Sequence, residues 1–225
     1  MSKDKTHRRP HFRLALFLAC AVLIFAAFDT LLSFTNTLHS LDAIESERDK
    51  WQRPVDVLRA LDLREGDSVA DLGSGSGYFA LKLSPAVGPS GQVLAVDLRR
   101  LSLFFLWTRA LLRGQHNVHV VAGDVGDPHL PTGTLGSVLI CNSFHEFKNP
   151  ERMLDHTFRS LRSGGRLVVV DHAPQGSESG KAHEVSLQVA ESSLRRAGFQ
   201  IVSREDRFIN RPGDDVWWLV TARKP

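Results

Sequence analysis

The chain has 225 residues, enough for one sizeable α/β domain with an extension. Its formal net charge of +3 is concentrated at the start. Residues 1–13 hold five basic residues and one acidic residue, a sum of +4, so the remaining residues sum to −1. A nearly neutral remainder argues against nucleic-acid binding, which needs a concentrated basic face. The two cysteines, Cys20 and Cys141, offer neither a disulfide framework nor a zinc site, and we expect no metal centre.

An apolar segment over residues 14–34 follows this basic tail. Residues 14–28 are fifteen consecutive apolar residues, and a bilayer span needs about twenty. The basic flank fits a signal peptide as well as a membrane anchor. A good cleavage site is missing, because Phe25 stands where a small residue is needed. We therefore predict an uncleaved membrane anchor.

The segment between the anchor and the main domain is polar and charged. We interpret residues 35–50 as a linker that runs into a helix over residues 55–61, with Pro54 in the first turn of this helix. The main domain is expected over residues 51–225.

The run VADLGSGSGYFAL, residues 69–81, is the most informative stretch. An apolar β-branched start, closely spaced glycines and a second apolar segment predict a strand, a tight turn and a helix in that order. Gly73, Gly75 and Gly77, with Ser74 between the first two, allow the backbone to approach a ligand closely. The free N–H groups at the start of the helix favour a nucleotide-type ligand.

The spacing of this loop narrows the ligand. A dinucleotide fingerprint reads G-x-G-x-x-G, but Tyr78 occupies the position of its last glycine. Asp71 precedes the loop and would repel a pyrophosphate. The same acid suits a ligand that carries an ammonium and a sulfonium group and no phosphate. S-adenosylmethionine (SAM) is such a ligand.

Polar residues also stand at the ends of the strands that follow. These strands are predicted over residues 92–96, 118–121 and 137–142. Open α/β sheets bind ligands at the carboxyl ends of their strands. Asp97 is expected to accept the ribose hydroxyls, and Asp124 the adenine amino group. Asn142, at the end of the third of these strands, is a further candidate cofactor contact.

The predicted helix over residues 101–112 has nine apolar residues among its twelve, and arginines surround it. A surface helix is normally apolar on about three of seven positions. One interpretation is a face that touches the membrane interface or an apolar acceptor. The other is a buried helix covered by the N-terminal segment.

The C-terminal part completes the predicted sheet. Its predicted elements are a helix over residues 150–161 ended by Gly164 and Gly165, a buried strand over 167–170, a loop over 174–180 and a helix over 182–197. Two late strands, over residues 199–209 and 215–222, form a hairpin and therefore an antiparallel edge on a parallel sheet.

The chain resembles the class I SAM-dependent methyltransferases. The matching residues are DLGSGSG at 71–77, Asp97, Gly123 with Asp124, and LRSGGRLVVVD at 161–171. More narrowly, RDKWQRP at 48–54 and FHEF at 144–147 are similar to small bacterial methyltransferases of the ubiquinone/menaquinone type. The resemblance covers residues 45–225. It implies cofactor roles for the glycine loop and the three acids, and no particular substrate. The fold it implies is Rossmann-like and doubly wound, a mostly parallel seven-stranded sheet with an antiparallel C-terminal hairpin, here preceded by an apolar helix.

We therefore predict a membrane-associated methyltransferase that transfers a methyl group from SAM to a small, apolar or amphipathic acceptor. His145 is the candidate general base, and its alternative role is to shape the pocket. A non-catalytic SAM-binding protein is the main alternative function, and an NAD(P)-dependent oxidoreductase is disfavoured by Tyr78 and by the hairpin.

The side of the membrane poses a conflict. The basic tail would place the domain outside the cell, whereas SAM is a cytosolic cofactor. We expect attachment on the cytoplasmic side.

Overall fold

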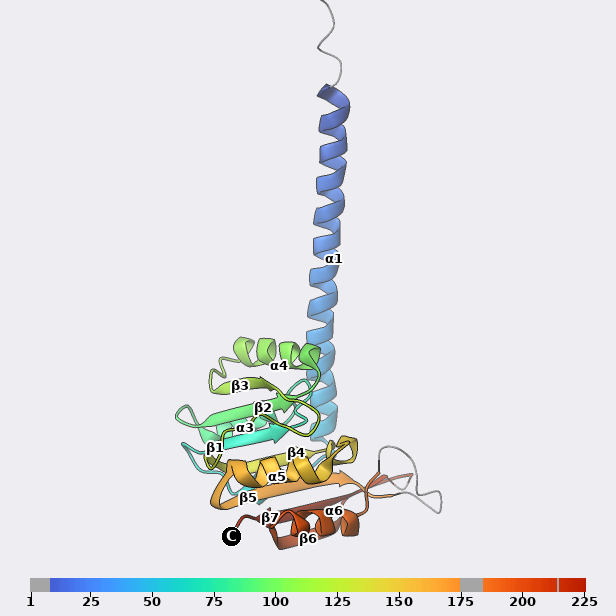
Figure 1. The fold of residues 1–225 in the computed structure, drawn as a ribbon. Helices are drawn as coiled ribbons and strands as arrows, with labels where there is room; N and C mark the ends of the chain where they lie inside the picture. Colours follow the sequence, from blue (N-terminus) through green and yellow to red (C-terminus); the bar gives the residue numbers. More distant parts are fainter. Residues whose placement is uncertain (1–8, 175–183, 214) are drawn as a thin grey trace, which may run out of the picture. The chain divides into compact units, whose positions relative to one another are not determined.

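The computed structural model describes residues 9–174, 184–213 and 215–225, with side chains from residue 15 onward. The chain divides into two compact units, Met1–Ser46 and Glu47–Pro225. The described part of the first unit is a single long helix, and the second unit contains the sheet and the helices that cover it (Figure 1).

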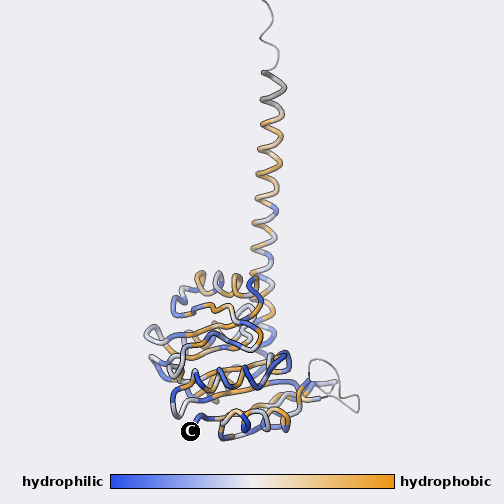
Figure 2. Tube along the Cα trace, in the orientation of Figure 1, coloured by the Kyte–Doolittle hydropathy of each residue, from blue (hydrophilic) through white to orange (hydrophobic). Residues whose placement is uncertain are grey.

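Helix α1 runs from Arg9 to Asp49. Its part Ala15–Asp49 is long and apolar enough to cross a membrane, judged by length and composition, and Figure 2 shows the apolar stretch in orange. The segment expected as a linker is helical down to Asp49. No glycine or proline interrupts residues 14–49. Serine and threonine hydroxyls of this segment donate hydrogen bonds to backbone carbonyls of the same helix. The Ser40 hydroxyl, for example, donates to the carbonyl oxygen one turn earlier.

The second unit is built on a seven-stranded sheet in the order β3-β2-β1-β4-β5-β7-β6. The strands are β1 Ser68–Leu72, β2 Gln92–Asp97, β3 Val118–Ala122, β4 Leu135–Cys141, β5 Leu161–His172, β6 Gln200–Arg211 and β7 Asp215–Arg223. The first five pair in parallel. β7 runs antiparallel to β5 and forms the edge hairpin with β6. The sheet confirms the predicted fold class.

Helices cover both faces of the sheet (Figure 1). They are α2 Pro54–Leu61, α3 Ala80–Val87, α4 Arg100–Leu112, α5 Pro150–Ser160 and α6 Leu187–Arg196, with a 3₁₀ turn η1 at Phe144–Glu146. Successive strand residues point to opposite faces. Val168 therefore packs in the core shared with α2, α3 and α4, and Val169 in the core shared with α5 and α6.

The structure corrects two predicted boundaries. The strand expected over residues 167–170 begins at Leu161, directly after α5, so Gly164 and Gly165 lie inside β5 rather than at a helix end. Leu161 already pairs with Leu135 of β4, and the Gly164 N–H donates to the Lys224 carbonyl. Pairing with neighbouring segments thus keeps the chain in the sheet at two glycines that the sequence suggested would end a helix. The predicted loop over 174–180 lies, except for residue 174, outside the described residues, as does the start of the helix predicted over 182–197.

Candidate cofactor and active site

The glycine loop between β1 and α3 is pinned against neighbouring elements. The N–H groups of Gly73 and Ser74 both donate to the Val96 carbonyl of β2, at 2.9 and 3.0 Å. Gly73 has a φ of 78°, and a Cβ there would overlap the Ser143 side chain. The loop can therefore lie this close to β2 and to the end of β4 only with glycine at position 73.

A polar cavity of about 310 Å³ lies against this loop. Its lining residues are Arg48, Asp71, Gly73, Ser74, Gly75, Ser76, Tyr78, Phe79, Arg99, Ser102, Cys141, Asn142 and Glu146. Five of the predicted cofactor residues meet here, from the loop and from the ends of β1 and β4.

Two buried oxygen atoms of this lining, Asp71 Oδ2 and Ser74 Oγ, have no hydrogen-bond partner among the described residues. Burial raises the pKa of Asp71 to about 7, a rise that the N–H of Ala80 and the charge of Arg48 oppose. An unpaired buried polar atom costs about 1–3 kcal/mol. A ligand ammonium group placed against Asp71 would remove that cost and favour the ionised carboxylate.

Arg48 brings a positive charge to the same cavity from the last turn of α1. Its Nε donates to Gln52 Oε1 at 2.6 Å, and its guanidinium lies 3.8 Å from the centre of the Tyr78 ring. Gln52 is fully buried, and its amide donates to Cys141 Sγ at 3.4 Å. The Arg48 side chain is thus held on two sides and presents a fixed cation to the cavity that the Asp71 carboxyl group also lines. An amino-acid zwitterion fits this pair of charges.

A second, more apolar cavity of about 210 Å³ lies beyond the ends of β2 and β3. Asp97 stands at its edge, buried, with Oδ2 accepting from the Gly75 N–H and Oδ1 from the Arg99 N–H, both at 2.8 Å. It therefore ties the glycine loop to the start of α4. Arg99 Nε also donates to Asp97 Oδ1, at 3.2 Å. A carboxylate accepts about four hydrogen bonds, so Asp97 keeps capacity for one ligand hydroxyl.

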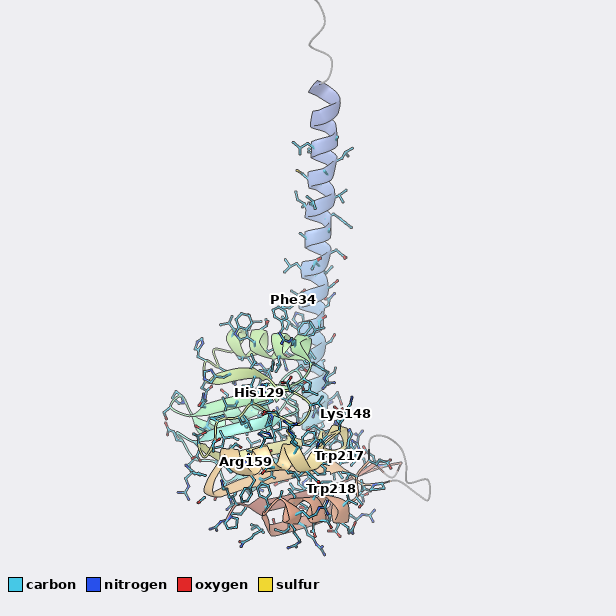
Figure 3. All side chains as sticks on the ribbon, in the orientation of Figure 1. Phe34, His129, Lys148, Arg159, Trp217 and Trp218 are labelled. Atoms are coloured by element: carbon cyan, nitrogen blue, oxygen red, sulfur yellow. The ribbon has the colours of Figure 1, made fainter. Side chains whose placement is uncertain are left out.

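The structure places the remaining predicted cofactor residues at the openings of these cavities. Asp124 lines the apolar cavity, is largely exposed, and pairs with His129 Nε2 at 3.2 Å. His129 is labelled in Figure 3. Asn142 is exposed and lines the polar cavity with a positive φ of 56°. Gly77 lines neither cavity. A Cβ on it would lie 2.7 Å from Leu106 Cγ, so its part is to let α4 pack against the loop.

His145 is separated from the cofactor residues, because it lines neither of these two cavities. Its Nδ1 is 2.7 Å from Oδ1 of the fully buried Asp171, and its backbone N–H donates to Asp171 Oδ2. The Asp171 hydrogen bond raises the pKa of His145. The neighbouring Glu146 lines both cavities, and its Oε1 lies 3.9 Å from His145 Nε2.

Sequence reasoning assigned no role to Arg48, Glu146 or Asp171. A signal was present in each case, because Arg48 opens the RDKWQRP run, Glu146 lies in FHEF, and Asp171 ends the LRSGGRLVVVD run.

Comparison with known proteins agrees with this geometry. Residues 69–165 match the family model described as a methyltransferase domain. An arsenite methyltransferase of Halobacterium salinarum is 32% identical over 108 residues, which cover 47% of this chain and 27% of the relative. The ubiquinone/menaquinone biosynthesis C-methyltransferase UbiE of Pasteurella multocida is 33% identical over 112 residues, 48% of this chain and 41% of the relative. The chain spans less than half the length of either relative.

Among solved structures, a SAM-dependent methyltransferase from Aquifex aeolicus superposes with a TM-score of 0.69. It is 23% identical, and the match covers 82% of this chain and 97% of that one. At this identity the likeness concerns the fold. Together with the family model and the relatives, it confirms the resemblance found in the sequence.

Proposed function

We propose that this chain, a class I SAM-dependent methyltransferase with SAM as its cofactor, methylates a small apolar or amphipathic acceptor at a membrane. The observation that carries the proposal is the polar cavity. There, Asp71 Oδ2 is buried with no hydrogen-bond partner in the part of the chain that the structure describes, and Arg48 brings a fixed cation to the same cavity. Opposite charges side by side fit the amino-acid end of SAM.

In this proposal the ammonium group of SAM meets Asp71 and its carboxylate meets Arg48. Ser74 Oγ, which lines the same cavity and is likewise unpaired among the described residues, accepts from the same ammonium group. The open backbone at Gly75, where a Cβ would have no atom within 4 Å, leaves room for the ligand. The amino-acid end is therefore held by charge on both sides.

The adenosine end fits the second cavity. Asp97 lines this cavity, accepts from the Gly75 N–H of the polar cavity, and accepts a ribose hydroxyl with its remaining capacity. The adenine ring lies among the apolar residues beyond it, which include Leu98, Val125 and Met153. Asp124, at the cavity edge, accepts from the adenine amino group.

SAM supplies an electrophilic methyl group, so the chain has to align the acceptor and exclude water. When the acceptor carries a proton, its attacking atom bonds to the methyl carbon as the carbon–sulfur bond breaks, and the proton needs a base. We assign this role to His145, which Asp171 orients through Nδ1. Glu146 lines the cavity and lies beside His145. In this proposal it takes the proton from the acceptor and passes it to His145.

The membrane part of the proposal rests on α1, whose residues Ala15–Asp49 are long and apolar enough to span a bilayer. An acceptor that partitions into lipid would be concentrated beside an enzyme anchored in this way. Because SAM is a cytosolic cofactor, we place the second unit on the cytoplasmic side.

Calorimetry of the full chain in detergent with SAM, S-adenosylhomocysteine (SAH) and NADH tests the cofactor site. We expect binding of the first two and none of NADH. No binding of SAM or SAH at millimolar concentration would contradict the proposal.

Turnover is tested with SAM labelled on its methyl group and a membrane lipid extract as the source of acceptor. We expect label in the organic phase. SAM binding with no label transferred to either phase would favour a non-catalytic SAM-binding protein, and label confined to water-soluble products would exclude an apolar acceptor.

A further inference from the structure

We propose that the outer face of α4 binds the surface of an anionic lipid bilayer and so orients the methyltransferase unit on the membrane. The inference rests on the membrane association proposed above and adds to it a second, peripheral contact. The face consists of Leu98, Leu101, Phe104, Trp107, Leu111 and Leu112, with Arg100 and Arg113 beside them.

This face is apolar and exposed. Among the described residues of the second unit, ten large apolar side chains are exposed, and six of them are the apolar members of this face. Their exposed fractions run from 48% to 71%. A helix that is apolar on all sides is normally buried, and α4 already buries Leu103 and Leu106 on its inner side. Its outer side therefore presents a large exposed apolar area, of the kind that marks interaction surfaces.

The aromatic pair favours a bilayer interface. Phe104 and Trp107 stack with ring centres 6.4 Å apart, and both are about half exposed. Helices that lie in the plane of a membrane carry tryptophan, phenylalanine and leucine on the buried side and arginine or lysine at its borders. Arg100 and Arg113, at the two ends of α4, are exposed and have this arrangement.

The charge around this face matches anionic headgroups. No aspartate or glutamate occurs between Asp97 and Asp124, whereas residues 14–225 together sum to −1. The acid-free stretch of residues 98–123 contains four arginines. Arg109 is buried and donates to the Ser76 carbonyl, and Arg99 pairs with Asp97 at 3.2 Å, which leaves Arg100 and Arg113 as the basic residues of this face. Basic residues near an anionic membrane surface strengthen binding to it. A protein partner would need a surface that is both acidic and apolar to match this face. An anionic bilayer has both properties by its nature.

The chain also keeps the second unit near the bilayer. Residues 35–46 separate the apolar segment from the second unit and are helical. At 1.5 Å per residue this helix spans about 18 Å, less than the width of about 40 Å expected for a domain of this size. The unit cannot diffuse away from the membrane, so an apolar basic face on it meets lipid at a high local concentration.

The face continues to the cofactor site. Leu98 and Val125, both 54% exposed, line the apolar cavity, and Arg99 at the start of α4 lines both cavities. A bilayer on this face therefore lies beside the opening of the apolar cavity.

Quenching of tryptophan fluorescence by brominated lipid tests the inference on the full chain, reconstituted in phosphatidylcholine vesicles with and without phosphatidylglycerol. We expect strong quenching that increases with phosphatidylglycerol and weakens in high salt. Trp107→Phe should remove most of it, because Trp217 and Trp218 are buried. The matched variant Trp51→Phe should retain it. Leu101→Asp with Leu112→Asp should lower the quenching, whereas Val189→Asp with Val202→Asp, equally apolar and exposed residues outside this face, should not.

Flotation with the vesicles and SAH binding are measured on the same samples, which separates the two levels of the proposal. A chain that floats and binds SAH, but whose quenching does not change in the Trp107 or leucine variants, would overturn the α4 contact alone. Self-association lost in Leu101→Asp with Leu112→Asp would instead identify a second copy of the chain as the occupant. A chain that does not float would overturn both the α4 contact and the membrane association.

Discussion

Replacing Arg48 with alanine should weaken SAH binding strongly and leave methylthioadenosine binding unchanged. The two ligands share the adenosine and the sulfur, but only SAH has the amino-acid end. Arg48 is held by Gln52 and Tyr78 beside Asp71, so its loss removes the one cation that we assign to the ligand carboxylate. Affinity for a ligand without that carboxylate should not depend on it.

The size of the effect follows from the contact that is lost. A hydrogen bond to a charged group contributes about 1.5–3 kcal/mol, which corresponds to an increase in Kd of about 10- to 100-fold. A second effect acts in the same direction. The charge of Arg48 opposes the rise in the Asp71 pKa, so Arg48→Ala raises this pKa further and leaves less of the carboxylate ionised near neutral pH.

Calorimetry of both ligands with wild type, Arg48→Ala and Arg48→Lys measures the effect. Lysine keeps the charge and loses the fixed fork of donors, so an intermediate SAH affinity is expected. Arg59→Ala, an exposed arginine on α2, is the matched control and should change neither affinity. An equal loss of SAH and methylthioadenosine affinity in Arg48→Ala would refute the carboxylate contact and leave Arg48 a purely structural role.

Three further predictions concern the remaining site residues. Because the ammonium group of SAH favours the ionised form of Asp71, the affinity for SAH should rise with pH up to about 7. At the acidic end the rise should be nearly tenfold per pH unit. Calorimetry should find no such rise in Asp71→Asn. Gly75→Ala should cost about as much stability as Gly114→Ala, since both positions have positive φ and open space. Only Gly75→Ala should lose SAM binding. Equal binding by both variants would argue against close approach of the ligand at Gly75. Asp171→Asn should lower the pKa of His145, because the hydrogen bond that raises it is weakened, and an NMR titration of the His145 ring that shows no decrease would contradict the pairing.

Local sequence patterns were sufficient to predict which residues meet around the glycine loop. Gly73 needs a positive φ and the absence of a side chain against Ser143, which only glycine provides. Asp71 lies near the end of β1 and Asp97 ends β2, and these strands pair in parallel, so the sheet brings both to the same edge. Where pairing and turn geometry are encoded within a few neighbouring residues, the sequence reveals the structure.

Contacts between distant segments were not predicted, because no local pattern encodes them. Arg48 reaches the cavity through Gln52 and Cys141, which are 89 residues apart. His145, in the turn η1, is oriented by Asp171, 26 residues later in β5. The start of β5 was misjudged for the same reason, since pairing with β4 and the Lys224 carbonyl decides the conformation of Gly164.

The position of Arg48 bears on where the cofactor site begins in the sequence. The family model covers residues 69–165 and thus includes Asp71, the glycine loop, Asp97 and Asp124, but neither Arg48 nor Asp171. Arg48 lies in the last turn of α1, the helix that also contains the candidate membrane span. If Arg48 binds the carboxylate of SAM, the cofactor site includes the first residues of the second unit, Glu47–Pro225, upstream of the family match. A chain that begins at residue 36 should then keep its affinity for SAH. A chain that begins at residue 51 should lose that affinity and still bind methylthioadenosine.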